Sequence, residues 1–491
     1  MRQGLLVAGR GITALWHSVD EFIQKWQKVI VWIEVVIITA IVISLCFNHF
    51  VDWDEAFTYN LVTRNNFLGI IEGTAKDVHP PFYYLAAKII TLFGGDSMFS
   101  VKITAVAGMA LSMILSATLV RKNWGIYAAL LLNLIIGLGP CILHYNLNMR
   151  MYSWTMAFTF GSALYAYEIT IQSNKRNWIM FLIMSLGGAY TQYFSIITIA
   201  FIYLYLGIYL IVKKREKIRA FIGICAATIV GYSPWLAVLF KQYQSSGTSG
   251  ELHVDLLKWY DLLVWNFGTN IEKTTEMVLL IFITALIIYI LKFRTFSFEN
   301  KLFIIMCVLN YIASCYAAVL IASTSEHFFH NRYTYHALIL IWLFIIIVMA
   351  NVKSWAVIPM GIWLAVICLS SYTIMYTEEY TKINELAATE TWIADNVSEN
   401  DTILYDFLTF DMIYSVYMPE QEFLYWEDMD LESMQGKEMW FFQLAGRYFT
   451  DNEKAVFNME VLEVGEFHLE SFIYGKIYKV HFKEDNGDAD E

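Results

Sequence analysis

The chain has 491 residues, of which 58% are hydrophobic and 16% are charged, and its mean hydropathy is +0.49. A soluble globular chain has about 45–50% apolar residues, so this composition excludes a wholly soluble protein and requires that most of the chain lies in lipid. The net charge of −12 is unevenly distributed: residues 378–491 contain 7 Lys and Arg against 27 Asp and Glu, and the rest carries +8. An acidic segment of this kind argues against nucleic-acid binding, and a basic remainder is typical of short cytoplasmic loops.

Apolar stretches of about 17–25 residues, the length that crosses roughly 30 Å of hydrocarbon as a helix, recur over the first three-quarters of the chain. Residues 1–28 are predicted to be a cytoplasmic segment, and the first span is predicted to be a retained helix because no small-residue cleavage site follows it. The predicted spans, eleven in number, are 29–47, 99–120, 124–142, 151–172, 178–191, 194–212, 219–239, 275–291, 302–323, 335–350 and 354–374.

Residues 79–95 are also apolar, and the charges in the loops decide whether they span. If they do not span and the N-terminus is inside, all the basic clusters fall in cytoplasmic loops, as the positive-inside rule requires. These clusters are Arg121 and Lys122, Lys175 and Arg176, 213–219, 292–301, and Lys353. We therefore predict that 79–95 is a short helix along the outer interface and that the C-terminal segment is external.

The C-terminal residues 378–491 have the pattern of a small external α/β domain. A helix is predicted over 381–397, and strands over 401–407, 439–444 and 473–482. The predicted domains are thus 1–28, a membrane domain over 29–375 whose first outer loop is 48–98, and 378–491. All six cysteines lie in apolar runs without metal-type spacing, so neither disulfides nor a zinc site are predicted.

Two acidic residues, Asp54 and Glu55, closely follow the first predicted span. A carboxylate at this level can deprotonate a hydroxyl group while an apolar tail stays in the lipid, so one of the two is a candidate general base. Acids at the start of a helix also interact favourably with its dipole and cap its free N–H groups. The residues alone leave both roles open.

The segment Asp77-Val78-His79-Pro80-Pro81 is a more specific signal. Two prolines end the loop and start a helix, which fixes Asp77 and His79 near the helix N-terminus. A helix N-terminus attracts phosphate. The alternative is a turn that only begins a helix.

With Asp54-Glu55, Asp77–Pro81 and the Arg150-Met151-Tyr152 start of a later span, the chain resembles the dolichyl-phosphate-mannose protein O-mannosyltransferases. It also resembles their bacterial relatives, the lipid A aminoarabinose transferases. These are GT-C-type glycosyltransferases of glycosyltransferase family 39. The resemblance extends loosely over 29–375 and does not assign the C-terminal domain.

The resemblance implies a helical GT-C membrane fold and an active site that faces outward. It implies an inverting transfer of a sugar from a polyprenyl-phosphate donor, with Asp54 as the leading base and Glu55 as its partner. The protein mannosyltransferases have Leu-Gly after the prolines, where this chain has Phe82-Tyr83. That departure weakens the expectation of a protein acceptor, so a lipid, glycan or protein acceptor stays open.

Because the leaving group is a lipid phosphate, the site needs cations that stabilise its charge. Basic residues at span ends also extend to lipid headgroups, so each cation has a structural alternative. The predicted donor-binding residues are Asp77, His79, Arg150, Tyr152, Lys241 and Arg332. His327, His330 and His336 are expected to form hydrogen bonds; no metal site is predicted, and Mg²⁺ or Mn²⁺ stays open as a cofactor.

These residues predict a glycosyltransferase in a cell membrane. The resemblance implies that this is the bacterial cytoplasmic membrane. The alternative is a transporter or flippase of a lipid-linked substrate, which usually has ionisable residues near the membrane midplane and inverted repeats. Here only Glu34 and Glu168 lie within or near a span, and the sequence has no internal repeat. A third hypothesis, an external sensor that the spans merely anchor, does not explain eleven helices.

Overall fold

The structure, a computed structural model, describes residues 2–47, 51–245, 274–325, 331–351, 354–398, 401–406, 410–444, 459–468 and 474–483. The chain forms two compact units. The helical unit comprises Met1–Cys46 and Asn66–Met375, and the C-terminal unit comprises Phe47–Asn65 and Tyr376–Glu491. The start of the predicted first outer loop therefore groups with the C-terminal residues.

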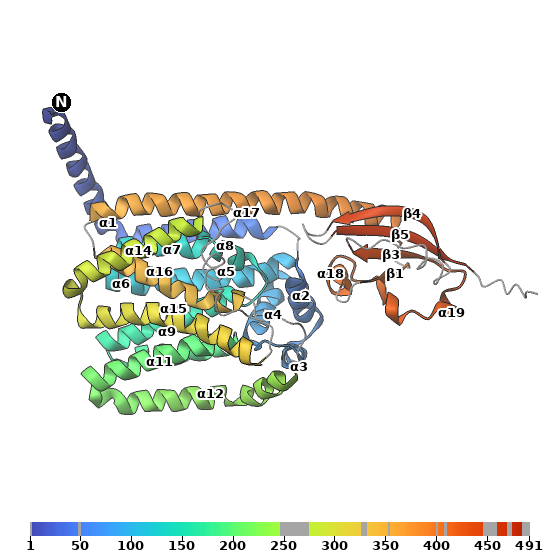
Figure 1. Ribbon diagram of the computed structural model, residues 1–491, viewed down its shortest axis with the longest axis horizontal. Helices are drawn as coiled ribbons and strands as arrows, with labels where there is room; N and C mark the ends of the chain where they lie inside the picture. The colour runs from blue at the N-terminus through green and yellow to red at the C-terminus, as the bar shows by residue number, and fades with distance from the viewer. Residues whose placement is uncertain are drawn as a thin grey trace, which may run out of the picture. The chain divides into compact units, whose positions relative to one another are not determined.

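The first unit is built from helices (Figure 1). They are α1 Arg2–Ser44, α3 Phe67–Lys76, α4 Phe82–Gly94, α5 Met98–Leu115, α6 Arg121–Trp124, α7 Ile126–Leu138, α8 Ile142–Leu147, α9 Tyr152–Ile171, α10 Lys175–Ala189, α11 Tyr193–Lys213, α12 Ile218–Ser245, α14 Thr274–Lys292, α15 Phe298–Ser325 and α16 Tyr335–Ala350. Helix α17, Ser354–Asn396, continues from this unit into the C-terminal unit. Shorter turns are η1 Leu45–Phe47, the π-helical η2 Ser116–Val120, η3 Arg215–Lys217, η4 Phe293–Thr295 and η5 Asn331–Thr334.

Among the described residues, seven helices are long and apolar enough to cross a membrane. They are His17–Phe47, Met98–Trp124, Tyr193–Lys213, Arg215–Gln244, Val278–Thr295, Phe298–Ile321 and Arg332–Ala350. Each corresponds to a predicted span, which confirms a multi-pass membrane protein; the total of eleven stays a prediction. Helix α4 has 13 residues, about 20 Å at 1.5 Å per residue, so it is too short to cross roughly 30 Å of hydrocarbon.

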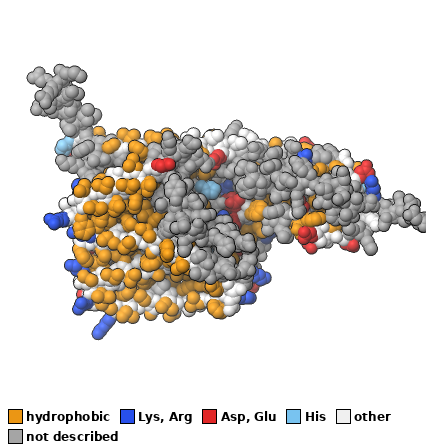
Figure 2. Space-filling model, in the orientation of Figure 1, with side chains coloured by type: hydrophobic (Ala, Val, Ile, Leu, Met, Phe, Trp, Pro, Cys, Tyr) orange, Lys and Arg blue, Asp and Glu red, His pale blue; other side chains and the backbone are white. Residues whose placement is uncertain are grey.

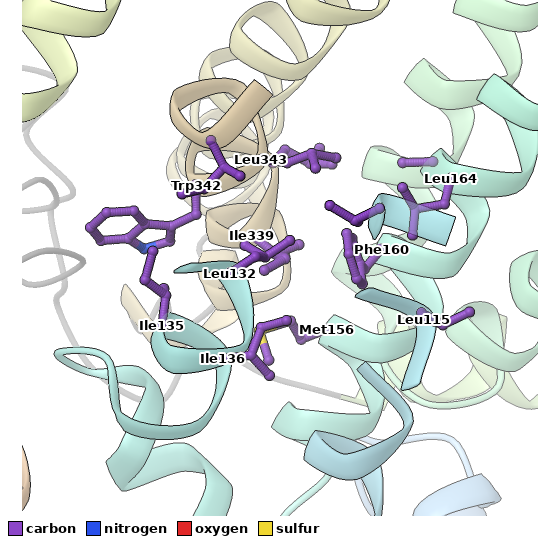
Figure 3. Packing of buried hydrophobic residues seen from close by; sticks show 14 of the residues in the cluster. Leu115, Leu132, Ile135, Ile136, Met156, Phe160, Leu164, Ile339, Trp342 and Leu343 are labelled. Carbon is purple, nitrogen blue, oxygen red and sulfur yellow. The ribbon is translucent and has the colours of Figure 1, made fainter. Parts of the chain in front are cut away.

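The core of the helical unit lies around α9 and α16, which are buried along nearly their whole length. Figure 3 shows side chains of α7, α9 and α16 packed together. The labelled residues of these helices are Leu132, Ile135, Ile136, Met156, Phe160, Leu164, Ile339, Trp342 and Leu343. Small residues allow such helices to approach closely. A Cβ atom added at Gly108 of α5 would lie 2.7 Å from the backbone nitrogen of Trp154 in α9, which is too close for a larger residue.

Basic loops that are far apart in the sequence meet at one end of this unit, which we call the basic end (residues 121–124, 168–176, 213–219 and 292–301). Lys122 Nζ lies 2.6 Å from Glu168 Oε2, and Lys214 Nζ donates to the Thr170 carbonyl at 2.7 Å. The Tyr209 hydroxyl donates to Glu299 at 3.1 Å. Figure 2 shows a broad hydrophobic face of this unit with Lys and Arg side chains along its left edge.

The C-terminal unit contains a five-stranded mixed sheet of order β2-β1-β3-β5-β4. Its strands are β1 Thr402–Tyr405, β2 Glu422–Tyr425, β3 Glu438–Leu444, β4 Met459–His468 and β5 Tyr474–Phe482. β1 pairs in parallel with β2 and β3, whereas β5 is antiparallel to β3 and β4. The predicted small sheet domain is confirmed.

Three of these strands lie where they were predicted, and β2 and β4 were missed. Shorter helical elements accompany the sheet: α2 Trp53–Arg64, α18 Phe410–Tyr417, α19 Leu431–Met434 and the turn η6 Trp426–Asp428. One face of the sheet packs Leu404, Phe441 and Val480 into a core. On the other face, the ring of Phe442 contacts Tyr414 of α18, with centroids 5.2 Å apart.

Candidate active site

The second end of the helical unit, opposite the basic end along α5 and α9, carries the predicted donor-binding residues. We call it the site end (residues 77–85, 144–152, 190–193 and 331–335). The Phe82 N–H at the start of α4 donates to the Tyr190 carbonyl at the end of α10, at 3.1 Å. The rings of Phe194 and Tyr333 are stacked with centroids 5.2 Å apart. These contacts join α4, α10, α11 and η5.

Arg150 is a buried cation of the site end. Its side chain is 3% exposed, and its Nη1 donates to the Tyr84 hydroxyl at 3.1 Å. Tyr84 is fully buried and packs edge-on against Tyr83, with ring centroids 5.7 Å apart. The Pro80-Pro81 turn starts α4 and so places the Tyr84 hydroxyl beside the Arg150 guanidinium. The sequence did not predict this contact.

Three tyrosines from different helices surround the start of α9. Tyr145 of α8 lies with its ring centroid 4.7 Å from Tyr152 of α9 and 4.8 Å from Tyr335 of α16. Burial raises the pKa of the Tyr145 phenol, and the positive charge of Arg332 acts in the opposite direction. Arg332, half-buried in η5, is thus within electrostatic range of this aromatic cluster.

Lys102 is a buried cation that sequence reasoning missed; it is 4% exposed. Helices α5 and α9 both run from the site end to the basic end, and Trp154 Nε1 donates to the Thr104 carbonyl at 2.7 Å. Ser153 Oγ donates to the Ala105 carbonyl at 2.6 Å. Lys102 lies two residues before Thr104 in α5, and because helical side chains lean towards the helix N-terminus, we expect its side chain to lean towards the site end. A lysine inside an apolar run was the available signal.

Asp77 and His79 lie where the sequence predicts, between α3 and α4. Asp77 ends α3, and its backbone N–H donates to the carbonyls of Gly73 and Thr74 at 3.1 and 3.2 Å. The Asp77 carboxylate lies close enough to Tyr193 of α11 for an electrostatic interaction. His79 is buried. Both therefore belong to the site end.

Lys241 is exposed near the end of α12. The neighbouring Gln242, which the sequence did not single out, is buried and donates to the Thr74 carbonyl at 2.7 Å. Tyr193 donates its hydroxyl to Gln242 Oε1. Gln242 thus ties α12 to α3 and α11, and Lys241 is the most solvated of the predicted cations.

Of the three histidines for which hydrogen bonds were expected, the structure describes His336. His336 is buried in α16, where its Nε2 lies 2.9 Å from Thr198 Oγ1, so it forms a hydrogen bond as expected. His327 and His330 lie outside the described residues. In the part of the chain that the structure describes, no group of three or more His, Cys, Asp or Glu residues could hold a metal ion. The dependence on Mg²⁺ or Mn²⁺ stays open.

The two candidate bases lie in α2, which is part of the C-terminal unit. Asp52 Oδ1 accepts the Glu55 N–H at 2.7 Å, and Glu55 Oε2 accepts the Asp52 N–H at 3.1 Å. This capping box satisfies two backbone donors at once. Glu55 is buried and has a structural task, whereas Asp54 is half-buried at the next position.

Comparison with known proteins bears on this arrangement. A family described as dolichyl-phosphate-mannose-protein mannosyltransferase matches residues 78–237, from Val78, directly after Asp77, through most of α12. None of the curated proteins matches the chain by sequence.

Two solved structures of ArnT from Cupriavidus metallidurans share the fold. The one bound to undecaprenyl phosphate has a TM-score of 0.60 at 11% identity and covers 92% of this chain and 97% of that chain. The apo structure has a TM-score of 0.58 at 11% identity and covers 96% of this chain and 98% of that one. The chain therefore has the ArnT-like GT-C fold, and its predicted resemblance to this group of glycosyltransferases is confirmed.

Proposed function

We propose that the chain is an integral-membrane glycosyltransferase that takes a sugar from a polyprenyl-phosphate donor. The observation that carries the proposal is the pair of cations Arg150 and Arg332 at the site end, in a fold shared with ArnT. We assign Lys102, a buried cation near the start of α5, to the same site. ArnT has been solved with undecaprenyl phosphate bound. Cations in a water-poor site interact strongly with a lipid phosphate, because the local dielectric constant is low.

The chemistry follows from these residues. Asp54 removes the proton of an acceptor hydroxyl, and the resulting oxygen attacks the anomeric carbon of the donor. The bond from that carbon to the phosphate oxygen breaks, and the polyprenyl phosphate leaves with the electron pair. Arg150, Lys102 and Arg332 stabilise the charge that builds on it. A single displacement of this kind inverts the anomeric centre.

The proposed reaction takes place on the outer face of the membrane, the bacterial cytoplasmic membrane by the family resemblance. Its support is the basic end, where the Lys and Arg loops gather, because cytoplasmic loops carry an excess of these residues. The site end is then external, as is the C-terminal unit. The acceptor is a lipid, a glycan or a protein.

The test measures transfer of labelled sugar from a panel of polyprenyl-phosphate sugars in lipid vesicles, comparing wild type with Asp54→Asn and Glu55→Gln. We expect Asp54→Asn to lose about a thousandfold, since general bases contribute about 10²–10⁴-fold. Glu55→Gln should stay within about tenfold, because glutamine also serves at this position of a capping box. It is the matched control.

Three outcomes would change the proposal. Full transfer by Asp54→Asn would remove the proposed base. Movement of an intact donor across the bilayer without bond cleavage would favour the flippase. A loss of transfer with chelator that Mg²⁺ or Mn²⁺ restores would add a divalent cation to the site.

A further inference from the structure

The helix that carries the proposed base is attached to the C-terminal unit. Helix α2 has 12 residues, a length at which an isolated helix is marginal in water, so its position depends on what it packs against. Residues Phe47–Asn65 group with Tyr376–Glu491 as one compact unit. The position of Asp54 is therefore determined within that unit.

Hydrogen bonds join α2 to α18 near both ends of α2. Asn60 Nδ2 donates to the Met412 carbonyl at 2.9 Å and lies 3.1 Å from Ser415 Oγ. Arg64 Nη2 donates to the Ser415 carbonyl at 2.8 Å. Before the first turn of α2, the Val51 N–H donates to the Tyr417 hydroxyl at 3.2 Å.

These contacts satisfy backbone carbonyls at the C-terminal end of α18. The last carbonyls of a helix have no partner within the helix, and Ser415 lies in the last turn of α18, which ends at Tyr417. A cation at a helix C-terminus also interacts favourably with the helix dipole. Arg64 supplies both the donor and the charge.

Helix α18 is in turn fixed to the sheet. Its Phe410 and Tyr414 are buried, and their ring centroids lie 5.9 and 5.2 Å from that of Phe442 in β3. A continuous set of packed side chains and hydrogen bonds thus runs from the sheet through α18 to α2.

The attachment uses a different face of α2 from the one that bears Asp54. Asn60 and Arg64 follow Asp54 by six and ten residues. At 3.6 residues per turn, this separation places them about 80–120° around the helix from Asp54. Helix α18 can hold α2 without occupying the face from which a base would act.

We propose that the C-terminal unit positions the base: α18, through Asn60 and Arg64, holds α2 and thereby sets the place of Asp54. The inference rests on the proposed function, and it gives the C-terminal unit a role in the transfer step. Asn60 and Arg64 are positioning residues that act through Asp54. A misplacement of about 1 Å in a catalytic group costs about a hundredfold in rate.

One test removes the attachment. In the sugar-transfer assay, Asn60→Ala/Arg64→Ala should lower kcat tenfold to a hundredfold and leave the KM for the polyprenyl-phosphate sugar within twofold. Lys437→Ala, which removes an exposed cation of the same unit, is the matched control and should transfer like wild type. Wild-type kcat in the double variant would overturn the inference.

A second test restores the attachment covalently and separates positioning from folding. Asn60→Cys alone should be slow, and Asn60→Cys/Ser415→Cys should regain at least half of the wild-type kcat when oxidised and lose it again on reduction. Loss of transfer on oxidation would mean that α2 must leave α18 during turnover, which overturns the inference. If Asp54→Asn transfers normally, the proposed base fails instead, whatever the cysteine pair does.

Discussion

The two ends of the helical unit use the same kinds of residue in opposite environments. At the basic end the Lys122 side chain is 51% exposed, and it pairs with Glu168, whose side chain is 2% exposed. Arg150 at the site end and Lys102 near the start of α5 are 3% and 4% exposed. The Lys122 side chain is thus open to its surroundings, whereas the protein itself surrounds Arg150 and Lys102.

Burial distinguishes the cations that orient the loops in the membrane from those that are candidates for the proposed site. Moving a charge out of water costs several kcal/mol. A lysine that only orients a helix does not need to be buried. Cations that orient loops need only be numerous and on one side. Burial beside a tyrosine hydroxyl, as for Arg150 with Tyr84, therefore makes a cation a candidate for the proposed site.

The largest expected effect concerns the orientation of the two ends and is all-or-none. Arg215→Cys, on the exposed side of the basic end, and Lys437→Cys, exposed in the C-terminal unit, should react with a membrane-impermeant maleimide from opposite sides. We expect labelling of Arg215→Cys only in inverted vesicles and of Lys437→Cys only in right-side-out vesicles. The unsubstituted chain controls for its six cysteines.

Labelling of both positions from the same side would break the comparison. The basic end would then not be the cytoplasmic end, and the proposed outward-facing site would lose its support.

The next effect concerns Arg150. Arg150→Met should lower sugar transfer at least a hundredfold, because it removes the guanidinium that contacts Tyr84 and that we expect to face the leaving phosphate. Arg150→Lys should recover part of the rate, since it keeps the charge and loses the planar donor geometry. Arg215→Met, which removes an exposed cation at the basic end, should stay within twofold; near-normal transfer by Arg150→Met would contradict the assignment.

Long apolar runs predicted most of the helical unit. Helix α16 begins and ends at the predicted residues 335 and 350, because a continuous run of large apolar side chains has clear limits. The prediction ended α17 at 374, where the apolar run stops, and placed a separate helix over 381–397. The structure has one helix to Asn396, since no glycine or proline interrupts the polar residues between them.

The C-terminal strands show the opposite limit. Strand β4 was missed because Glu460, Glu463 and Glu466 interrupt its apolar residues and Gly465 lies among them; those acids suit an edge strand. Strand β2 has only four residues. In both cases the pairing partner stabilises the strand more than its own pattern does.

Local motifs predicted the places of single residues, whereas contacts between distant segments were missed. Asp77 and His79 follow from the two prolines. The link from Asn60 and Arg64 to α18 ends on backbone carbonyls of Met412 and Ser415, about 350 positions away, and a backbone carbonyl has no residue signature. Lys102 was overlooked because the apolar run around it was interpreted only as a membrane span, although a lysine inside such a run is itself a signal.

The smallest effect comes from the same substitution made at two lysines. Lys102→Met, near the start of α5, should lower transfer tenfold to a hundredfold, since it removes a buried cation that we assign to the proposed site. Lys102→Arg should recover most of the rate because it keeps the charge. The measurement is kcat and KM with a polyprenyl-phosphate sugar, and wild-type values for Lys102→Met would remove this residue from the site.

Lys122→Met, at the basic end, should leave the transfer rate of the folded protein within twofold. It should lower the thermal midpoint in detergent by a few degrees, because Glu168 loses the Lys122 ammonium, at 2.6 Å, and keeps the Asn123 amide, at 2.7 Å. Glu168→Gln/Lys122→Met, in which no buried charge is left unpaired, should regain part of that midpoint. A loss of transfer in Lys122→Met that matches Lys102→Met would show that exposure does not separate the two classes of cation, and burial would no longer serve to identify the site.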